Sequence, residues 1–277
     1  MTAFEVADGG VVLRGDDDGE GPPILLLHGL SATRRYVLHG STALIRDGYR
    51  LIAYDARGHG ESDAAPSPDA YGYAAMVDDA VRVLDDRGVQ RAAVAGMSMG
   101  AAVGAALALA HPDRVSALVA ITPAHLGHAS RDPGRWERLA TGLETGGPEG
   151  FVQAYGDPGV DPASLDLIRT VMRQRMGRHA HPGAVAAALR ATPAGRAFDG
   201  EDALARITCP ALVVGSRDRL DPEHPLSIAE RWAQLIPDAR LVVEDPGQSP
   251  LAWRGGSLSR EIAAFLAAAG IPPRATR

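Results

Sequence analysis

Short apolar runs alternate with longer helical patterns along the first half of the chain. The short runs predict buried strands, and the longer stretches, with apolar residues three or four apart, predict helices. In chain order, we expect strands at residues 24–28, 50–54, 91–95 and 115–121, and helices at 73–86 and 99–110. This alternation is typical of a mostly parallel sheet with helices on both faces.

The two ends of the chain extend the same pattern. Residues 3–6 and 11–14 predict an N-terminal hairpin that turns at an Asp-Gly-Gly sequence. Near the other end, strand and helix patterns alternate again, and we expect strands at 211–215 and 240–244 and helices at 226–235 and 257–268.

Residues 125–205 interrupt this rhythm, because they contain helical patterns and no convincing strand. We expect helices at 134–144, 148–155, 163–177 and 183–191. The predicted fold class is therefore α/β, with residues 1–124 and 206–277 forming the core and residues 125–205 forming an inserted helical cap over the strand ends.

The composition narrows the possible chemistry. The sequence has no lysine and no asparagine, which excludes Schiff-base catalysis, the P-loop lysine and Cys-His-Asn catalysis. Its single cysteine, Cys209, cannot form an internal disulfide. We expect neither a metal nor an organic cofactor, and catalysis by Ser, His, Asp, Glu or Arg.

Charge and hydropathy predict an ordinary cytoplasmic bacterial enzyme. The net charge is −6 with both signs interspersed, so we expect no nucleic-acid partner and no membrane partner. No apolar stretch is long enough to span a bilayer, and the N-terminus lacks the cationic start of a signal peptide. A small-molecule substrate is expected, and a homo-oligomer remains possible.

The sequence Gly-Met-Ser-Met-Gly at residues 96–100 matches G-x-S-x-G. An apolar strand pattern enters it and an alanine-rich helix pattern leaves it, which is the context that this motif requires of a nucleophilic serine. Ser98 is therefore the candidate nucleophile.

Three further segments complete a resemblance to the α/β-hydrolase superfamily over essentially the whole chain. His-Gly-Leu at 28–30 is similar to the family's oxyanion loop, and residues 55–62 match its D-x-R-G-x-G-x-S signature. Residues 210–218 resemble the strand and turn that present its acid. His28, Arg57 and His59 are expected to hold these loops rather than to act in catalysis.

The resemblance implies roles for particular residues. Ser98 would be the nucleophile, and the backbone N–H groups of Leu30 and Met99 would form the oxyanion hole. Asp218 is the implied acid, with Asp221 as a competing candidate.

Glutamine stands where the resemblance implies the catalytic histidine. The segment after the last strand reads Glu-Asp-Pro-Gly-Gln-Ser-Pro, so Gln248 takes the place of the base, and no histidine follows His224. A glutamine amide forms hydrogen bonds but takes up no proton near neutral pH. If Gln248 occupies the position of the catalytic histidine, we expect hydrolysis by Ser98 to be severely impaired.

Three interpretations of Gln248 stay open. The chain is an inactivated variant of an esterase-like serine hydrolase, acting on a small, mainly apolar ester, lactone or thioester. Alternatively, the same pocket and oxyanion hole serve a non-hydrolytic lyase, isomerase or cyclase reaction. Third, the protein only binds a ligand, or uses a substitute base such as His125 or His128.

The substrate pocket is expected between the strand ends and the cap. Its predicted lining residues are Met97, His125, Trp136, Leu139 and Tyr155. Arginines and histidines gather at residues 169–181, and an apolar stripe on the same helix favours their being its solvated face. The other interpretation is that they receive an anionic substrate or an acyl-carrier group.

Overall fold

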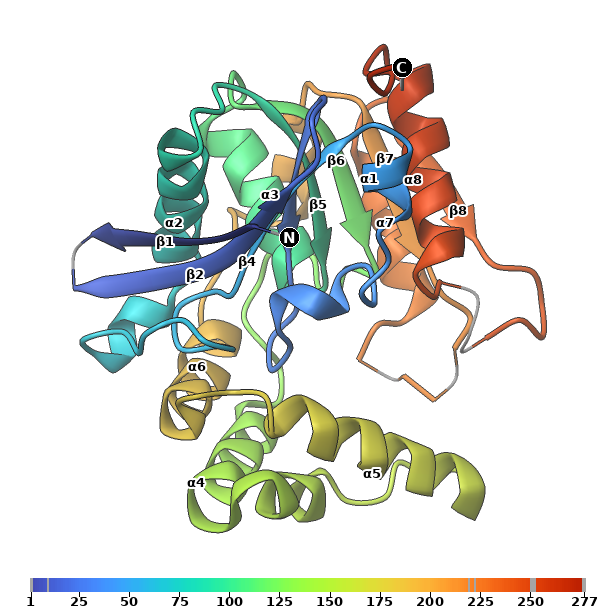
Figure 1. The fold of residues 1–277 in the computed structure, drawn as a ribbon. Coiled ribbons are helices and arrows are strands. Elements are labelled where there is room, and N and C mark those ends of the chain that lie inside the picture. Colours follow the sequence, from blue (N-terminus) through green and yellow to red (C-terminus); the bar gives the residue numbers. More distant parts are fainter. Residues whose placement is uncertain (1, 9, 219, 222, 250–252, 276–277) are drawn as a thin grey trace.

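The computed structural model describes residues 2–8, 10–218, 220–221, 223–249 and 253–275. Its eight strands form one sheet in the order β1-β2-β4-β3-β5-β6-β7-β8 (Figure 1). The β1-β2 and β2-β4 pairs are antiparallel and all other pairs are parallel, which confirms the predicted sheet. The strands are β1 (Thr2–Asp8), β2 (Val11–Asp18), β3 (Pro23–Leu27), β4 (Arg50–Tyr54), β5 (Ala92–Met97), β6 (Val115–Ile121), β7 (Ala211–Gly215) and β8 (Arg240–Val243).

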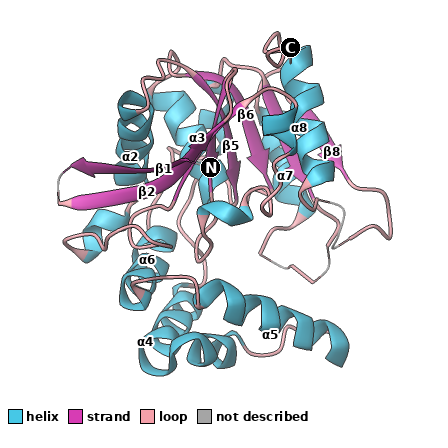
Figure 2. Cartoon of the chain, viewed as in Figure 1, coloured by secondary structure: helices cyan, strands magenta, loops and turns pink. Residues whose placement is uncertain are grey.

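Helices cover both faces of this sheet, as expected (Figure 2). In β3, Leu25 and Leu27 face one apolar cluster while Ile24 and Leu26 face the other, because successive side chains of a strand point to opposite faces. The first cluster includes side chains of α2 (Tyr73–Asp86), α3 (Met99–Ala110) and α7 (Leu226–Leu235), and the second includes those of α1 (Ala43–Arg46) and α8 (Gly256–Ala268). Three short 3-10 helices, η1 (Arg34–Tyr36), η2 (Pro68–Tyr71) and η3 (Glu201–Arg206), lie in the connections.

Three helices between β6 and β7 form a separate layer beyond the carboxyl ends of the parallel strands, at the bottom of Figure 1. They are α4 (Pro133–Tyr155), α5 (Pro162–Met176) and α6 (Pro182–Ala194), called the helical layer below. The carboxylates of Asp132 and Asp161 cap the first two helices, each of which starts with proline. The layer has its own apolar cluster, which includes Leu139, Phe151 and Leu189.

The largest difference from the expected boundaries is in the N-terminal hairpin, where strands expected at residues 3–6 and 11–14 extend over Thr2–Asp8 and Val11–Asp18. The two helices predicted at residues 134–144 and 148–155 correspond to the two helical parts of α4, which meet at a kink. At the kink, Gly147 has a φ of 59°, directly before Pro148. None of the helices in the described part of the chain is long and apolar enough to cross a membrane.

Candidate active site

Ser98 lies in a sharp turn between β5 and α3, with a backbone φ of 54° and ψ of −111°. A positive φ is unfavourable for a residue with a Cβ and costs on the order of 1–3 kcal/mol. The turn holds this conformation because strand and helix pass very close together. A Cβ on Gly96 would overlap the carbonyl of Gly100, and one on Gly100 would overlap the carbonyl of Leu27. The strained serine at the sheet edge is the geometry that the G-x-S-x-G motif predicts.

The loop after β3 runs beside this serine. A Cβ on Gly29 would lie 3.4 Å from Cβ of Ser98, so the loop backbone is in contact range of the serine side chain. The N–H groups of Leu30 and Met99 make no hydrogen bond to any other described residue. The two predicted oxyanion donors therefore flank Ser98, one from the loop and one from the first residue of α3, where the helix dipole adds a partial positive charge.

A histidine contacts Ser98, and it is His224. Its Nε2 lies 2.7 Å from Oγ of Ser98, and its Nδ1 lies 2.7 Å from Oδ2 of Asp221. An ionised carboxylate only accepts hydrogen bonds, so the Nδ1–H donates to Asp221 and Nε2 accepts from the serine hydroxyl. This hydrogen-bonded chain has the order and geometry of a Ser-His-Asp triad.

The carboxylate that contacts His224 is that of Asp221, the competing candidate, rather than that of the favoured Asp218. Burial alone would raise the pKa of Asp221, but the hydrogen bond and charge of His224 outweigh it and hold the pKa below its ordinary value. Asp218 accepts from the backbone N–H of Leu220, and burial raises its pKa. Asp218 lines the same cavity as Asp221 and makes no contact with His224.

The structure does not bring Gln248 to Ser98. Its side chain is exposed, and it lines neither cavity that contains Ser98. The loop after β8 is instead fixed by Glu244, whose Oε1 accepts from the Ser216 hydroxyl at 2.8 Å, the Arg217 N–H at 2.7 Å and the Ser249 hydroxyl. These contacts join the loops after β7 and β8 without bringing Gln248 to the serine.

One feature of the sequence points to His224 as the histidine that contacts Ser98. His224 is the last histidine of the chain, and it lies three residues after an aspartate in the loop that follows β7. Counting histidines beyond the acid-bearing strand would have singled it out. Comparison with the loop after the last strand led instead to Gln248.

Three buried histidines hold the oxyanion loop. Nε2 of His28 accepts from the Ala56 N–H at 2.8 Å, and Nδ1 donates to the Gly29 carbonyl at 2.8 Å. His59 accepts from the Ser31 N–H at 3.3 Å, and His179 donates to the Ser31 carbonyl at 3.2 Å. Burial lowers the pKa of His28 to about 4, of His59 to about 3 and of His179 to about 4. Each ring is therefore neutral and serves as both donor and acceptor, as expected for structural roles of His28 and His59.

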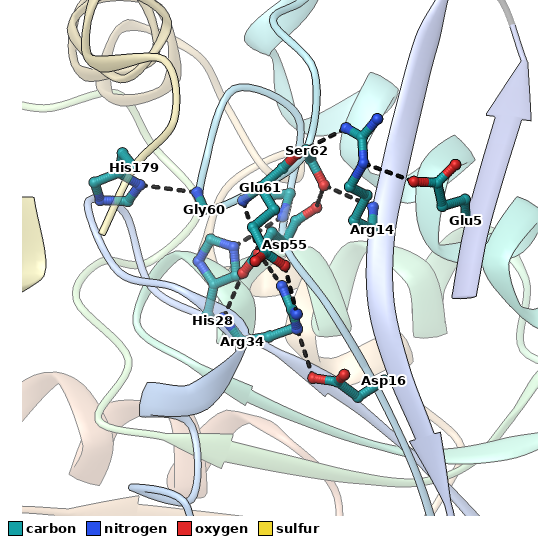
Figure 3. A network of polar contacts seen from close by, with 11 residues as sticks. Glu5, Arg14, Asp16, His28, Arg34, Asp55, Gly60, Glu61, Ser62 and His179 are labelled. Atoms are coloured by element: carbon teal, nitrogen blue, oxygen red, sulfur yellow. Dashed lines mark hydrogen bonds and ion pairs between the residues drawn. The ribbon is translucent and has the colours of Figure 1, made fainter. Parts of the chain in front are cut away.

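The D-x-R-G-x-G-x-S segment surrounds a buried carboxylate (Figure 3). Asp55 accepts from the backbone N–H of Arg34 at 2.8 Å and of Glu61 at 3.1 Å, and it forms an ion pair with the Arg34 guanidinium. The Ser62 hydroxyl donates to the Asp55 carbonyl at 2.6 Å and accepts from the Arg14 N–H at 2.9 Å. These bonds connect the loop after β4 to β2 and to the segment that follows the oxyanion loop.

The same segment is also tied to α2. Arg57 makes two hydrogen bonds of 2.7 Å to the carboxylate of Asp79, and both side chains are buried. The structure therefore gives Arg57 the expected structural role.

Two cavities meet at Ser98, Leu30 and Trp136. The first has a volume of about 350 Å³ and contains His224 and Asp221 together with apolar side chains of the helical layer. The second has a volume of about 410 Å³. Together they give the serine a largely apolar space between the sheet edge and the helical layer.

The predicted lining residues divide between these cavities. Leu139 and Tyr155 line the first, His125 and Met99 line the second, and Trp136 lines both. Met97 lines neither and packs against the apolar cluster on the α8 side of the sheet. The first cavity is also lined by residues that the sequence did not predict, among them Phe151, Met172, Leu189, Arg175 and Glu223.

His125 and His128, the substitute bases considered, belong to the second cavity. His125 Nε2 lies 2.9 Å from the Tyr73 hydroxyl, and its Nδ1 accepts from the Gly127 N–H at 3.0 Å. Burial lowers the pKa of His125 to about 4. Both of its nitrogens are therefore used away from Ser98.

The sheet order, the serine turn and the hydrogen-bonded histidine define a protein with an α/β-hydrolase fold. A family model described as alpha/beta hydrolase fold matches residues 22–145. The putative carbamate hydrolase RutD of Variovorax paradoxus is 32% identical over 265 residues, which cover 94% of this chain and 96% of that protein. The chain therefore belongs to the α/β-hydrolase family.

Solved structures agree with this assignment. A thermophilic esterase from Thermogutta terrifontis superposes with a TM-score of 0.80 at 27% identity, over 97% of this chain and 99% of the esterase. The enol-lactonase from Burkholderia xenovorans gives a TM-score of 0.78 at 24% identity, over 95% of this chain and 100% of its own, which supports the shared fold.

Proposed function

We propose that the protein is a serine hydrolase that cleaves small esters or lactones with a Ser98-His224-Asp221 triad. The observation that carries this proposal is the pair of 2.7 Å contacts from Ser98 Oγ to His224 Nε2 and from His224 Nδ1 to Asp221 Oδ2. Relatives described as a carbamate hydrolase, an esterase and an enol-lactonase support cleavage next to a carbonyl group.

In the proposed reaction, His224 takes the proton of Ser98 as Oγ attacks the carbonyl carbon of the substrate. The resulting oxyanion accepts from the N–H groups of Leu30 and Met99, and Asp221 stabilises the imidazolium. His224 then gives its proton to the departing oxygen, leaving an acyl-serine. A water molecule, deprotonated by His224, attacks this acyl group and releases the acid and free Ser98.

The non-hydrolytic and ligand-binding interpretations depended on a serine without a base. A histidine at hydrogen-bond distance from Ser98 favours hydrolysis over both. The helical layer, which we propose to be the cap of residues 125–205, covers the reacting serine and provides an apolar environment for the substrate.

Hydrolysis of p-nitrophenyl acetate and butanoate tests the proposal. We expect the unmodified chain to turn over at least one of them, and Ser98→Ala or His224→Ala to lower kcat by about 10³- to 10⁶-fold. Gln248→Ala is the matched control, because that side chain is exposed, and it should stay within about twofold of the parent. A gain in activity for Gln248→His, with no loss for His224→Ala, would restore Gln248 as the position of the base.

A further inference from the structure

The charged side chains around the first cavity are mostly paired. Arg135 forms an ion pair of 2.7 Å with Glu223, and His224 is paired with Asp221. Arg175 lines the same cavity and has no carboxylate partner among the described residues. The third arginine that lines the cavity, Arg254, is exposed to solvent. Among the described residues of this lining, Arg175 is therefore the arginine that has neither an ion pair nor an exposed side chain.

Arg175 extends from α5 toward the oxyanion loop. Its Nη2 donates to the Leu30 carbonyl at 3.3 Å and to the Ser31 hydroxyl at 3.2 Å, and the guanidinium lies 5.7 Å from the centre of the Tyr36 ring. Its Nε is buried and has no hydrogen-bond acceptor. Two long hydrogen bonds to neutral oxygens leave much of the donor capacity of this side chain unused.

The electrostatic situation of Arg175 is unfavourable without an anion. Burial lowers its pKa, against the opposing influence of Tyr36, Asp221 and Tyr155. An arginine nevertheless stays charged at neutral pH. Removing a cation from water without a close counter-ion costs free energy, which an anion bound in the cavity would offset.

The other arginines of this region face elsewhere. Arg173, two residues away on the same helix, is exposed and forms an ion pair with Glu149. Arg178 is also exposed, and neither residue lines the cavity. The cluster at residues 169–181 therefore separates into a solvated face, the buried His179, and Arg175, which lines the cavity.

We propose that Arg175 binds a carboxylate of the substrate, so that the hydrolysed class is small esters or lactones that carry a second, ionised carboxyl group. This inference rests on the proposed function, because it uses Ser98 as the reacting group. Guanidinium and carboxylate match each other in a planar, two-bond geometry. Arg175 already contacts the carbonyl of Leu30, whose N–H is the proposed oxyanion donor, so the bound carboxylate would lie close to the reacting carbonyl.

Two pairs of esters that differ only in charge test this assignment. In the first pair the charge is on the acyl side: mono-p-nitrophenyl adipate against its methyl ester. In the second it is on the alcohol side: p-acetoxybenzoate against methyl p-acetoxybenzoate. Arg175→Met should lower kcat/KM for the charged member of one pair about 10- to 100-fold more than for its neutral partner. Arg175→Lys keeps the positive charge but not the planar, two-bond geometry of the guanidinium. It should lower kcat/KM for the charged ester selectively, but by less than Arg175→Met does.

Arg173→Met is the matched control, since it removes an arginine from the same helix outside the cavity, and it should leave both charged-to-neutral ratios unchanged. If Arg175 only positioned Leu30, its loss would lower both members of each pair equally, and this result would overturn the assignment.

Calorimetry separates this inference from the proposed function. Monomethyl adipate should bind Ser98→Ala, which cannot turn it over, and its affinity for the double variant Ser98→Ala/Arg175→Met should be lower by about 10-fold or more. Failure of every ester to turn over would contradict the proposed function while this binding experiment still tested Arg175. Equal affinities for Ser98→Ala and Ser98→Ala/Arg175→Met would overturn the carboxylate assignment.

Discussion

The acid and base of the proposed triad come from residues only three positions apart, Asp221 and His224. The serine that they serve is 126 residues away in the sequence from His224. With acid and base in one loop, the contact that fixes the histidine tautomer is local, and only one long-range contact is needed to complete the triad. Asp218 lies in the same loop and shares the cavity, so the two carboxylates differ in what they contact rather than in where they lie.

This difference predicts opposite outcomes for two matched variants. Asp221→Asn should lower kcat by about 10³- to 10⁴-fold, because the amide no longer stabilises the imidazolium and can favour the wrong histidine tautomer. Asp218→Asn should retain activity within a few-fold, since among the described residues that carboxylate accepts a backbone N–H and makes no hydrogen bond to His224. Esterase kinetics on the two purified variants decide between them, and the reverse ranking would make Asp218 the acid.

At the scale of elements, the β5-α3 unit depends on close backbone packing. Helix α3 is buried on nearly all sides, and Gly100 faces the carbonyls of Leu27 and His28 at the end of β3. The sharp β5-α3 turn at Ser98, called the elbow below, therefore requires a residue without a side chain at position 100. Most helix positions of the chain accommodate a side chain. Glycines at open helix positions carry only the entropic cost of a flexible backbone.

Two glycine-to-alanine substitutions separate these situations. Gly100→Ala should lower the free energy of unfolding by about 3 kcal/mol or more, because its Cβ would overlap backbone atoms that cannot move independently. Gly183→Ala, near the start of α6 with no atom within 4 Å of the added Cβ, should raise it by about 0.5–1 kcal/mol. Chemical denaturation measures both, and equal effects would contradict the close packing at the elbow.

At the scale of the whole molecule, buried neutral histidines join separate parts of the structure. His28 and His59 link the loops after β3 and β4, and His179 joins the helical layer to both through Ser31 and Gly60. His125 is a fourth ring, half-buried and held by Tyr73. The seam between sheet and helical layer thus depends on imidazoles that accept hydrogen bonds, and protonation removes that ability.

Stability should therefore fall as the solution becomes more acidic. The folded-state pKa values of these four histidines lie at about 3 to 4, below the ordinary value of 6.5. Between these values the unfolded chain binds more protons than the folded one, so the free energy of unfolding decreases as pH falls from about 6.5 toward 4, by up to about 1.4 kcal/mol per pH unit for each histidine.

Denaturant titrations at several pH values across this window measure the slope. His179→Gln keeps a donor and an acceptor but does not titrate. It should therefore make the free energy of unfolding depend less steeply on pH, by the contribution of about one bound proton. A free energy of unfolding that stays constant from about pH 6.5 to pH 5 would contradict this account.

The sequence by itself determined the type and order of nearly all elements, the elbow around Ser98 and the structural roles of His28, Arg57 and His59. These features depend on local periodicity, on glycine spacing and on motifs within a few residues, so one segment contains the information. The break predicted between residues 144 and 148 likewise coincides with the kink of α4 at Gly147, where glycine and proline stand side by side.

Only the tertiary structure decided which histidine meets Ser98 and which arginine faces the cavity. Both depend on the paths of loops and helices that are distant in sequence. The loop after β8 is fixed by bonds from Glu244 to the loop after β7, which leave Gln248 in solvent. On α5, the packing of the helical layer against the oxyanion loop turns Arg175 inward while Arg173 faces outward. Both arrangements follow from long-range contacts: no local pattern indicates the orientation of Arg175, and for His224 the sequence holds only the indirect sign that it is the one histidine after residues 211–215.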